Sequence, residues 1–75
     1  MIVQTFGNVL CELRKEQNIS QEKLAEYCDL DRTYISLLER GLRQPTLTTI
    51  FKISSALKIR PSKLIETVES RTNVI

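Results

Sequence analysis

The sequence predicts a single all-α domain of five short helices. Apolar residues recur at steps of three and four along most of the chain, which is the spacing of helices with one buried face. Capping side chains stand at the expected helix starts, and only two glycines and two prolines interrupt the 75 residues. No segment alternates as a strand does. We expect one unit over residues 1–75, with its core in residues 5–68 and a tail in residues 69–75.

The first two helices are predicted over residues 5–17 and 21–28. Asn18 tolerates the left-handed backbone that ends a helix, and Ser20 is a suitable N-cap for the second helix. The apolar stripe of the first helix consists of Phe6, Val9, Leu10 and Leu13. The inward face of the second consists of Leu24, Ala25 and Cys28.

The third helix is expected to begin after its cap Asp31 and to stop at Gly41. It follows the second helix after about three residues, which is the proportion of a helix-turn-helix. Thr46 caps the fourth helix, and the fifth begins at Arg60 or Pro61. The fourth helix has the stripe Leu47, Ile50, Phe51, Ile53, Ser54 and Leu57, and the fifth presents Leu64, Ile65 and Val68.

The composition argues against catalysis and against a bound cofactor. The chain has no histidine, and histidine is the usual general base and metal ligand at neutral pH. Cys11 and Cys28 lack the paired spacing of a zinc site, and no phosphate-binding loop or nucleophile motif is present. We expect no enzyme activity, no cofactor, no metal and no small-molecule ligand. Without a signal peptide or an apolar run near 18 residues, a cytoplasmic protein with reduced thiols is expected, not one that binds a membrane.

The positive charge is concentrated in the middle of the chain. The formal net charge is +2, but residues 1–31 hold 3 basic and 6 acidic side chains, whereas residues 32–63 hold 7 basic side chains and only one acidic one. A concentrated basic region in a small domain favours a polyanionic partner, with nucleic acid the first candidate. A solvated basic face without a partner is the alternative that charge alone leaves open.

The third helix has two distinct faces at about 100° per residue. Ile35 and Leu38 face inward, with Tyr34 and Glu39 at the borders. The outward arc consists of Arg32, Thr33, Ser36, Leu37 and Arg40. Small side chains between two arginines suit a DNA major groove, because they let the helix approach the base edges while the guanidinium groups reach guanines or phosphates.

Three segments resemble a known family of regulators. They are QEKLA at residues 21–25, LDRTYIS at residues 30–36 and ERG at residues 39–41. They are similar to the phage-repressor and Cro type of helix-turn-helix protein, called the XRE family, and most similar to controller proteins of restriction-modification systems. The resemblance covers about residues 6–65 and implies a lambda-repressor-like DNA-binding domain, with the second and third helices as the helix-turn-helix.

The resemblance implies further DNA contacts outside the third helix. Gln21 would hold a phosphate with its amide and the N–H groups at the helix start, and Arg43 would reach the DNA from the loop. The full set of predicted contacts is Gln21, Arg32, Thr33, Tyr34, Ser36, Leu37, Arg40 and Arg43.

Two positions in the resemblance are structural. Arg14 and Glu39 match an internal ion pair that ties the first helix to the third.

Asp29 stands at a turn position where the family usually has glycine, so we expect a positive φ and the same turn. Lys58 and Arg60 replace smaller residues at the junction of the last two helices, and the sequence does not decide whether they contact DNA.

One recognition helix covers only a few base pairs, so we expect a homodimer on paired half-sites about 34 Å apart or a multiple of that. The predicted interface consists of Phe51, Leu57, Ile59, Leu64 and Ile65. Leu64 and Ile65 are adjacent, so one of the two should face the partner chain. If this interface is wrong, the first helix or the segment at residues 70–75 is the next candidate.

The expected function is sequence-specific regulation of transcription on a double-stranded DNA operator. For a controller protein, the resemblance implies autoregulation of a restriction-modification operon by helping RNA polymerase to bind and by repressing at higher occupancy. The alternatives are a phage-type repressor, or an antitoxin-like autoregulator whose last two helices bind a protein partner.

Overall fold

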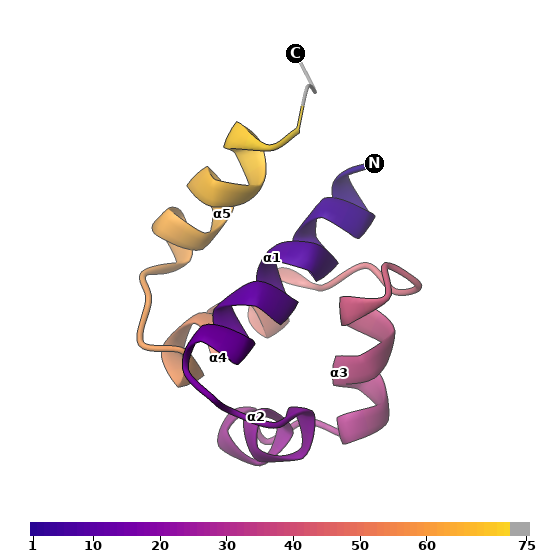
Figure 1. The fold of residues 1–75 in the computed structure, drawn as a ribbon, viewed down its shortest axis with the longest axis vertical. Coiled ribbons are helices and arrows are strands. Elements are labelled where there is room, and N and C mark those ends of the chain that lie inside the picture. The colour runs from indigo at the N-terminus through magenta and orange to yellow at the C-terminus, as the bar shows by residue number, and fades with distance from the viewer. Residues whose placement is uncertain (73–75) are drawn as a thin grey trace.

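The structure is a computed structural model and describes residues 1–72. This part of the chain contains five α-helices joined by short turns and loops. No strand occurs in that part. The helices are α1 (Ile2–Glu16), α2 (Gln21–Cys28), α3 (Arg32–Glu39), α4 (Leu47–Ala56) and α5 (Pro61–Ser70). The predicted all-α, five-helix fold is confirmed. Figure 1 shows α1 running through the middle, with α3 on one side of it and α5 on the other.

The first and last helices extend beyond their expected bounds. α1 begins three residues early because the carbonyl of Met1 accepts bonds from the backbone N–H of Thr5 at 3.0 Å and from its hydroxyl at 2.8 Å. Val3 then contributes to an apolar groove beside α5. The tail predicted from residue 69 begins later, since α5 runs to Ser70. Residues 73–75 of the tail lie outside the described residues.

Polar caps and left-handed residues set the turns between helices. Ser20 and Thr46 accept bonds from the backbone N–H groups of Lys23 and Thr49, as N-caps do. Asp29 has a φ of 56° at the end of α2, so its expected positive φ is confirmed. The short turn after it places α3 against α2, in the arrangement of a helix-turn-helix.

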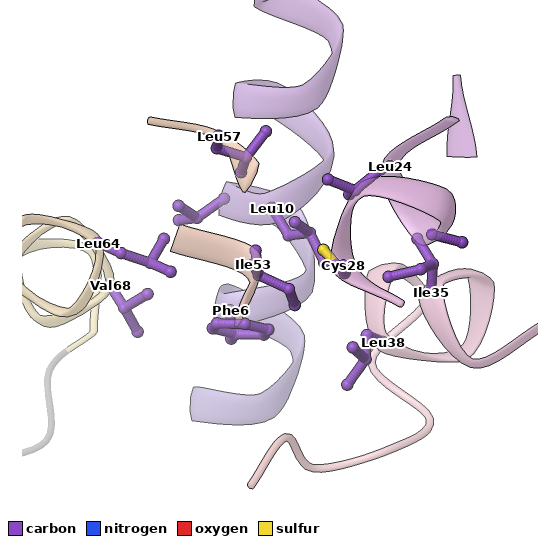
Figure 2. Close-up of a cluster of buried hydrophobic side chains, with 12 residues drawn as sticks. Phe6, Leu10, Leu24, Cys28, Ile35, Leu38, Ile53, Leu57, Leu64 and Val68 are labelled. Carbon is purple, nitrogen blue, oxygen red and sulfur yellow. The ribbon is translucent and has the colours of Figure 1, made fainter. Parts of the chain in front are cut away.

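All five helices contribute to one hydrophobic core (Figure 2). The most completely buried large side chains come from every helix, and they are Leu10, Leu24, Ile35, Leu38, Ile53, Leu57 and Leu64. Cys28 packs among them, and its burial raises the pKa of its thiol. This core holds α3 rigidly, because its inward residues are fixed between α1 and α2.

Leu57 and Leu64 belong to this core and not to a dimer interface. They are 1% and 0% exposed, so the prediction that they contact a partner chain is wrong. The apolar stripe of α4 is wider than the core needs, and helical spacing alone does not show which part of a wide stripe packs inward. Leu47 and Phe51 of that stripe are exposed instead.

Ser54 is a polar residue inside the core, and replacing it should not destabilise the protein. It is 0% exposed, and its Oγ has no hydrogen-bond partner within residues 1–72. Ser54→Ala removes an unpaired buried hydroxyl and raises helix propensity, so we expect an unchanged or higher free energy of unfolding, by up to about 1 kcal/mol. Urea denaturation measures it.

Ser55→Ala is the matched control, since Ser55 is the exposed neighbour in the same helix and its replacement changes only helix propensity. A Ser54→Ala variant that is clearly less stable than both the wild type and Ser55→Ala would contradict the interpretation that the Ser54 hydroxyl is unpaired.

Candidate nucleic-acid interface

The outward arc of α3 lies on the surface, as its sequence requires. Ile35 and Leu38 are completely buried, which fixes the rotation of the helix. The opposite face then presents Arg32, Thr33 and Arg40 as exposed residues and Ser36 and Leu37 as half-buried ones. The two small side chains leave the backbone of α3 open to close approach. This is the shape that a helix needs to enter a major groove.

Two arginines of this arc and one in the loop after it have no acidic partner within residues 1–72. Arg32 and Arg40 lie at the two ends of α3, and Arg43 lies in the loop that follows. Arg40 makes only a long bond, 3.4 Å, to the carbonyl of Ser36. Their guanidinium groups therefore keep their donors for an anionic partner.

Tyr34 lies at the border between the arc and α4. Its hydroxyl is 3.3 Å from the Oγ1 of Thr49, whose hydroxyl is in turn 2.9 Å from that of Thr46, the N-cap of α4. Tyr34 is half-buried and thus links α3 to the start of α4. Its predicted contact with DNA stays a prediction.

The predicted pair of Arg14 and Glu39 is in direct contact. Arg14 Nε lies 2.6 Å from Glu39 Oε2, and Arg14 Nη2 lies 3.0 Å from Glu39 Oε1. A third donor, Arg14 Nη1, bonds the carbonyl of Ile19 at 2.7 Å. Both side chains are about nine-tenths buried. The pair therefore joins α1 and the turn after it to the end of α3.

Hydrogen bonds and opposite charge together outweigh burial in this pair. The bond from Glu39 raises the pKa of Arg14 despite desolvation. Burial raises the pKa of Glu39, but the hydrogen bonds from Arg14 and Gln21 and the charge of Arg14 outweigh burial, so that its pKa is lowered overall. Both groups are thus held in their charged forms.

The amide of Gln21 belongs to this same network, which sequence reasoning missed. Gln21 Nε2 donates to Glu39 Oε1 at 2.9 Å, so one hydrogen of the amide predicted to reach a phosphate is already used within the chain. The second amide hydrogen and the N–H groups at the start of α2 are left for that role. No short-range pattern signals a contact between residues 18 positions apart.

Several apolar side chains are exposed on the α4 and α5 side of the molecule. Of the five residues predicted to form an interface, Phe51 and Ile65 are exposed, Ile59 is half-buried against the core, and only Leu57 and Leu64 are enclosed. Of the adjacent pair in α5, Ile65 is therefore the outward residue. Exposed Leu47 continues this surface along α4.

The described residues carry neither a membrane-spanning helix nor a metal cluster. No helix within residues 1–72 has the length and apolar character needed to cross a bilayer. Nor does this part of the chain bring three or more Cys, Asp or Glu side chains together in a way that would hold a metal ion.

Known proteins are similar to this chain in both sequence and fold. A family model described as helix-turn-helix matches residues 12–64. The control protein C.BamHI of Bacillus amyloliquefaciens is 50% identical over 62 residues, which are 81% of this chain and 76% of the relative.

Two solved structures are similar along most of their length. The restriction-modification controller protein C.AhdI from Aeromonas hydrophila has a TM-score of 0.81 and 44% identity, with 83% of this chain and 94% of that protein covered. The controller protein C.Esp1396I, solved as a tetramer in complex with its natural 35 base-pair operator, has a TM-score of 0.85 and 30% identity, with 93% and 92% covered. Given these matches in sequence and in fold, the chain belongs to the helix-turn-helix family, in the group formed by the controller proteins of restriction-modification systems.

Proposed function

We propose that this protein binds a double-stranded DNA operator as a homodimer and regulates transcription of the restriction-modification operon that contains its own gene. The observation that carries the proposal is the outward arc of α3, in which small side chains lie between arginines that form no ion pair in the described part of the chain. This arrangement combines base readout by the helix with phosphate contacts at its ends.

In this proposal, α3 enters the major groove and Thr33 and Ser36 face the base edges. Arg32, Arg40 and Arg43 contact guanines or phosphates, while the start of α2 at Gln21 holds the backbone. Tyr34 and Leu37 complete the contact surface. Since one such helix reads only a few base pairs, two copies on half-sites about 34 Å apart supply the specificity.

The operator complex of C.Esp1396I, in which that protein is a tetramer, supports binding of more than one copy to neighbouring sites. Autoregulation then follows from occupancy: a first dimer helps RNA polymerase to bind, and further copies exclude it. A phage-type repressor or an antitoxin-like autoregulator would use the same arc on other operators. The group of relatives favours the controller role.

Ser36→Glu tests the arc directly. Glutamate places a bulky negative charge where the helix approaches the bases and phosphates, so we expect loss of operator binding by a factor of about 100 or more, equivalent to the 1–3 kcal/mol of one lost base contact plus phosphate repulsion. Binding is measured by footprinting and gel shift on the DNA upstream of its own gene, against a shuffled fragment of equal length.

Ser55→Glu is the matched control, because it adds the same side chain at an exposed position of α4 outside the arc. Both variants should unfold close to the wild type. If Ser36→Glu stays folded and binds as tightly as Ser55→Glu, the proposed face of α3 is wrong. If the wild type does not distinguish the upstream fragment from the shuffled one, the regulatory proposal itself fails.

A further inference from the structure

Thr49 is a buried polar residue whose hydroxyl is not required to cap α4. It is 6% exposed and lies in the first turn of that helix. The N-cap Thr46 accepts a hydrogen bond from the backbone N–H of Thr49 at 3.1 Å, and a valine at this position would donate the same bond. Valine has nearly the same shape and avoids the free-energy cost of burying a hydroxyl. The contacts of the hydroxyl itself must therefore explain why a threonine stands here.

The hydroxyl of Thr49 contacts two other hydroxyls and forms no other hydrogen bond within residues 1–72. Its Oγ1 lies 2.9 Å from Oγ1 of Thr46 and 3.3 Å from Oη of Tyr34. The contact with Tyr34 joins α4 to the border of the outward arc of α3. At 3.3 Å it is long for two hydroxyl groups, so the phenol of Tyr34 can still turn toward a further partner.

This row of three hydroxyls can direct its hydrogens in either of two directions. Each hydroxyl donates one hydrogen and accepts through two lone pairs. If Thr46 donates to Thr49 and Thr49 donates to Tyr34, the phenol hydrogen points away from the row. In the opposite direction Tyr34 donates to Thr49, and the phenol offers only lone pairs to a partner. Both directions are open in the free protein, because Thr46 is exposed and can exchange hydrogen bonds with water.

A phosphate of DNA distinguishes between these two directions. Its oxygens accept hydrogen bonds and cannot donate them, so only the direction that ends on the phenol hydrogen suits it. Each bond in such a row polarises the next one, and a bond to a charged acceptor is stronger than one to a neutral acceptor. Thr49 is the middle member, so loss of its hydroxyl interrupts the row.

We propose that Thr49 is a positioning residue for operator binding, whose buried hydroxyl donates to Tyr34 and so directs the phenol hydrogen to a phosphate oxygen of the DNA backbone. The inference deepens the proposed function and rests on it. Thr49 itself does not touch the DNA in this arrangement. It acts through Tyr34, whose half-buried ring lies between α4 and the outward arc of α3.

Thr49→Val tests this inference, because it removes the hydroxyl and keeps the shape of the side chain. We expect it to bind the DNA upstream of its own gene about fivefold more weakly than the wild type in gel shifts, the size of one ordinary net hydrogen bond. Thr49→Ala, a second variant without the hydroxyl, should show a similar loss. Thr49→Ser retains the hydroxyl and should bind nearly as tightly as the wild type.

A double-mutant cycle with Tyr34→Phe separates positioning from a merely structural effect. If Thr49 acts through the phenol, Tyr34→Phe should also weaken binding, and Tyr34→Phe/Thr49→Val should bind as Tyr34→Phe does. The loss should be the same on operators that differ by one base pair, because a phosphate contact carries no sequence information.

Thr48→Val is the matched control, since it makes the same change at the exposed neighbour of Thr49 in α4. Thermal unfolding of every variant identifies a temperature at which all of them are folded. The inference is overturned if Thr49→Val binds like Thr48→Val, if its loss persists in the Tyr34→Phe background, or if the loss depends on one base pair. In each of these cases a wild type that prefers the upstream fragment to the shuffled one leaves the proposed function standing. A wild type without that preference overturns the proposed function, and the inference with it.

Discussion

Glu39→Ala should lower the free energy of unfolding by about 3–5 kcal/mol, since removing one partner of a buried ion pair leaves the other charge without compensation. Arg14 is only 9% exposed, and Glu39 accepts bonds from its Nε and Nη2. The variant also frees Gln21, whose amide donates to the same carboxylate. A loss of this size is a large share of the stability of a small domain. Urea denaturation measures it.

Glu12→Ala is the matched control, because it breaks another Arg–Glu pair of similar length on the surface. Arg71 Nη1 lies 2.9 Å from Glu12 Oε2, but the two side chains are 44% and 52% exposed. Water and salt screen such a pair, so the unfolding transition should barely move. If the two variants lost the same free energy of unfolding, the expectation that breaking a buried ion pair destabilises more than breaking an exposed one would be contradicted.

The pH dependence provides a second measurement on the same pair. The pKa of Glu39 is lowered from its ordinary value of 4.5, so the folded protein binds this proton less readily than the unfolded chain. The stabilisation is therefore fully present above 4.5 and is lost as the pH falls through the lower pKa of the folded state. Glu39→Gln removes this titration, so its stability should fall less steeply than that of the wild type below pH 4.5.

The helix order was predictable from the sequence because caps and spacing are local. Ser20 and Thr46 accept the bonds expected of N-caps. The positive φ of Asp29 was implied by the family resemblance at its turn position. The start of α1 was missed because the side chain of its N-cap residue, Met1, forms no capping bond that a sequence could signal.

The remaining differences between the predicted and the observed structure depend on contacts between helices that are far apart in the sequence. The stripe of α4 contains Leu57, which is buried, and Phe51, which is exposed, and only the positions of α2 and α5 decide between them. The spacing in α5 required one of Leu64 and Ile65 to face outward, but it did not say which. The bond from Gln21 to Glu39 likewise depends on how α2 and α3 cross.

Gly7→Ala should lower the free energy of unfolding by about 2 kcal/mol, although alanine is the better helix former by about 1 kcal/mol. α1 and the end of α3 meet at this glycine. A Cβ here would lie 2.7 Å from the carbonyl oxygen of Glu39 and closer still to that of Leu38. Both oxygens belong to the backbone, so neither can rotate away, and the steric term should exceed the gain in helix propensity.

Asn8→Ala is the control for helix propensity, since Asn8 is the exposed neighbour of Gly7 in α1. Its free energy of unfolding should stay within about 0.5 kcal/mol of the wild type. Gly7→Ala should also weaken operator binding at temperatures where the variant is still folded, because relief of the contact requires α1 and the recognition helix to separate. Urea denaturation and gel shift measure the two effects. A Gly7→Ala variant as stable as Asn8→Ala would mean that α1 and α3 have room to move apart, and α3 would then not be held as rigidly as its burial indicates.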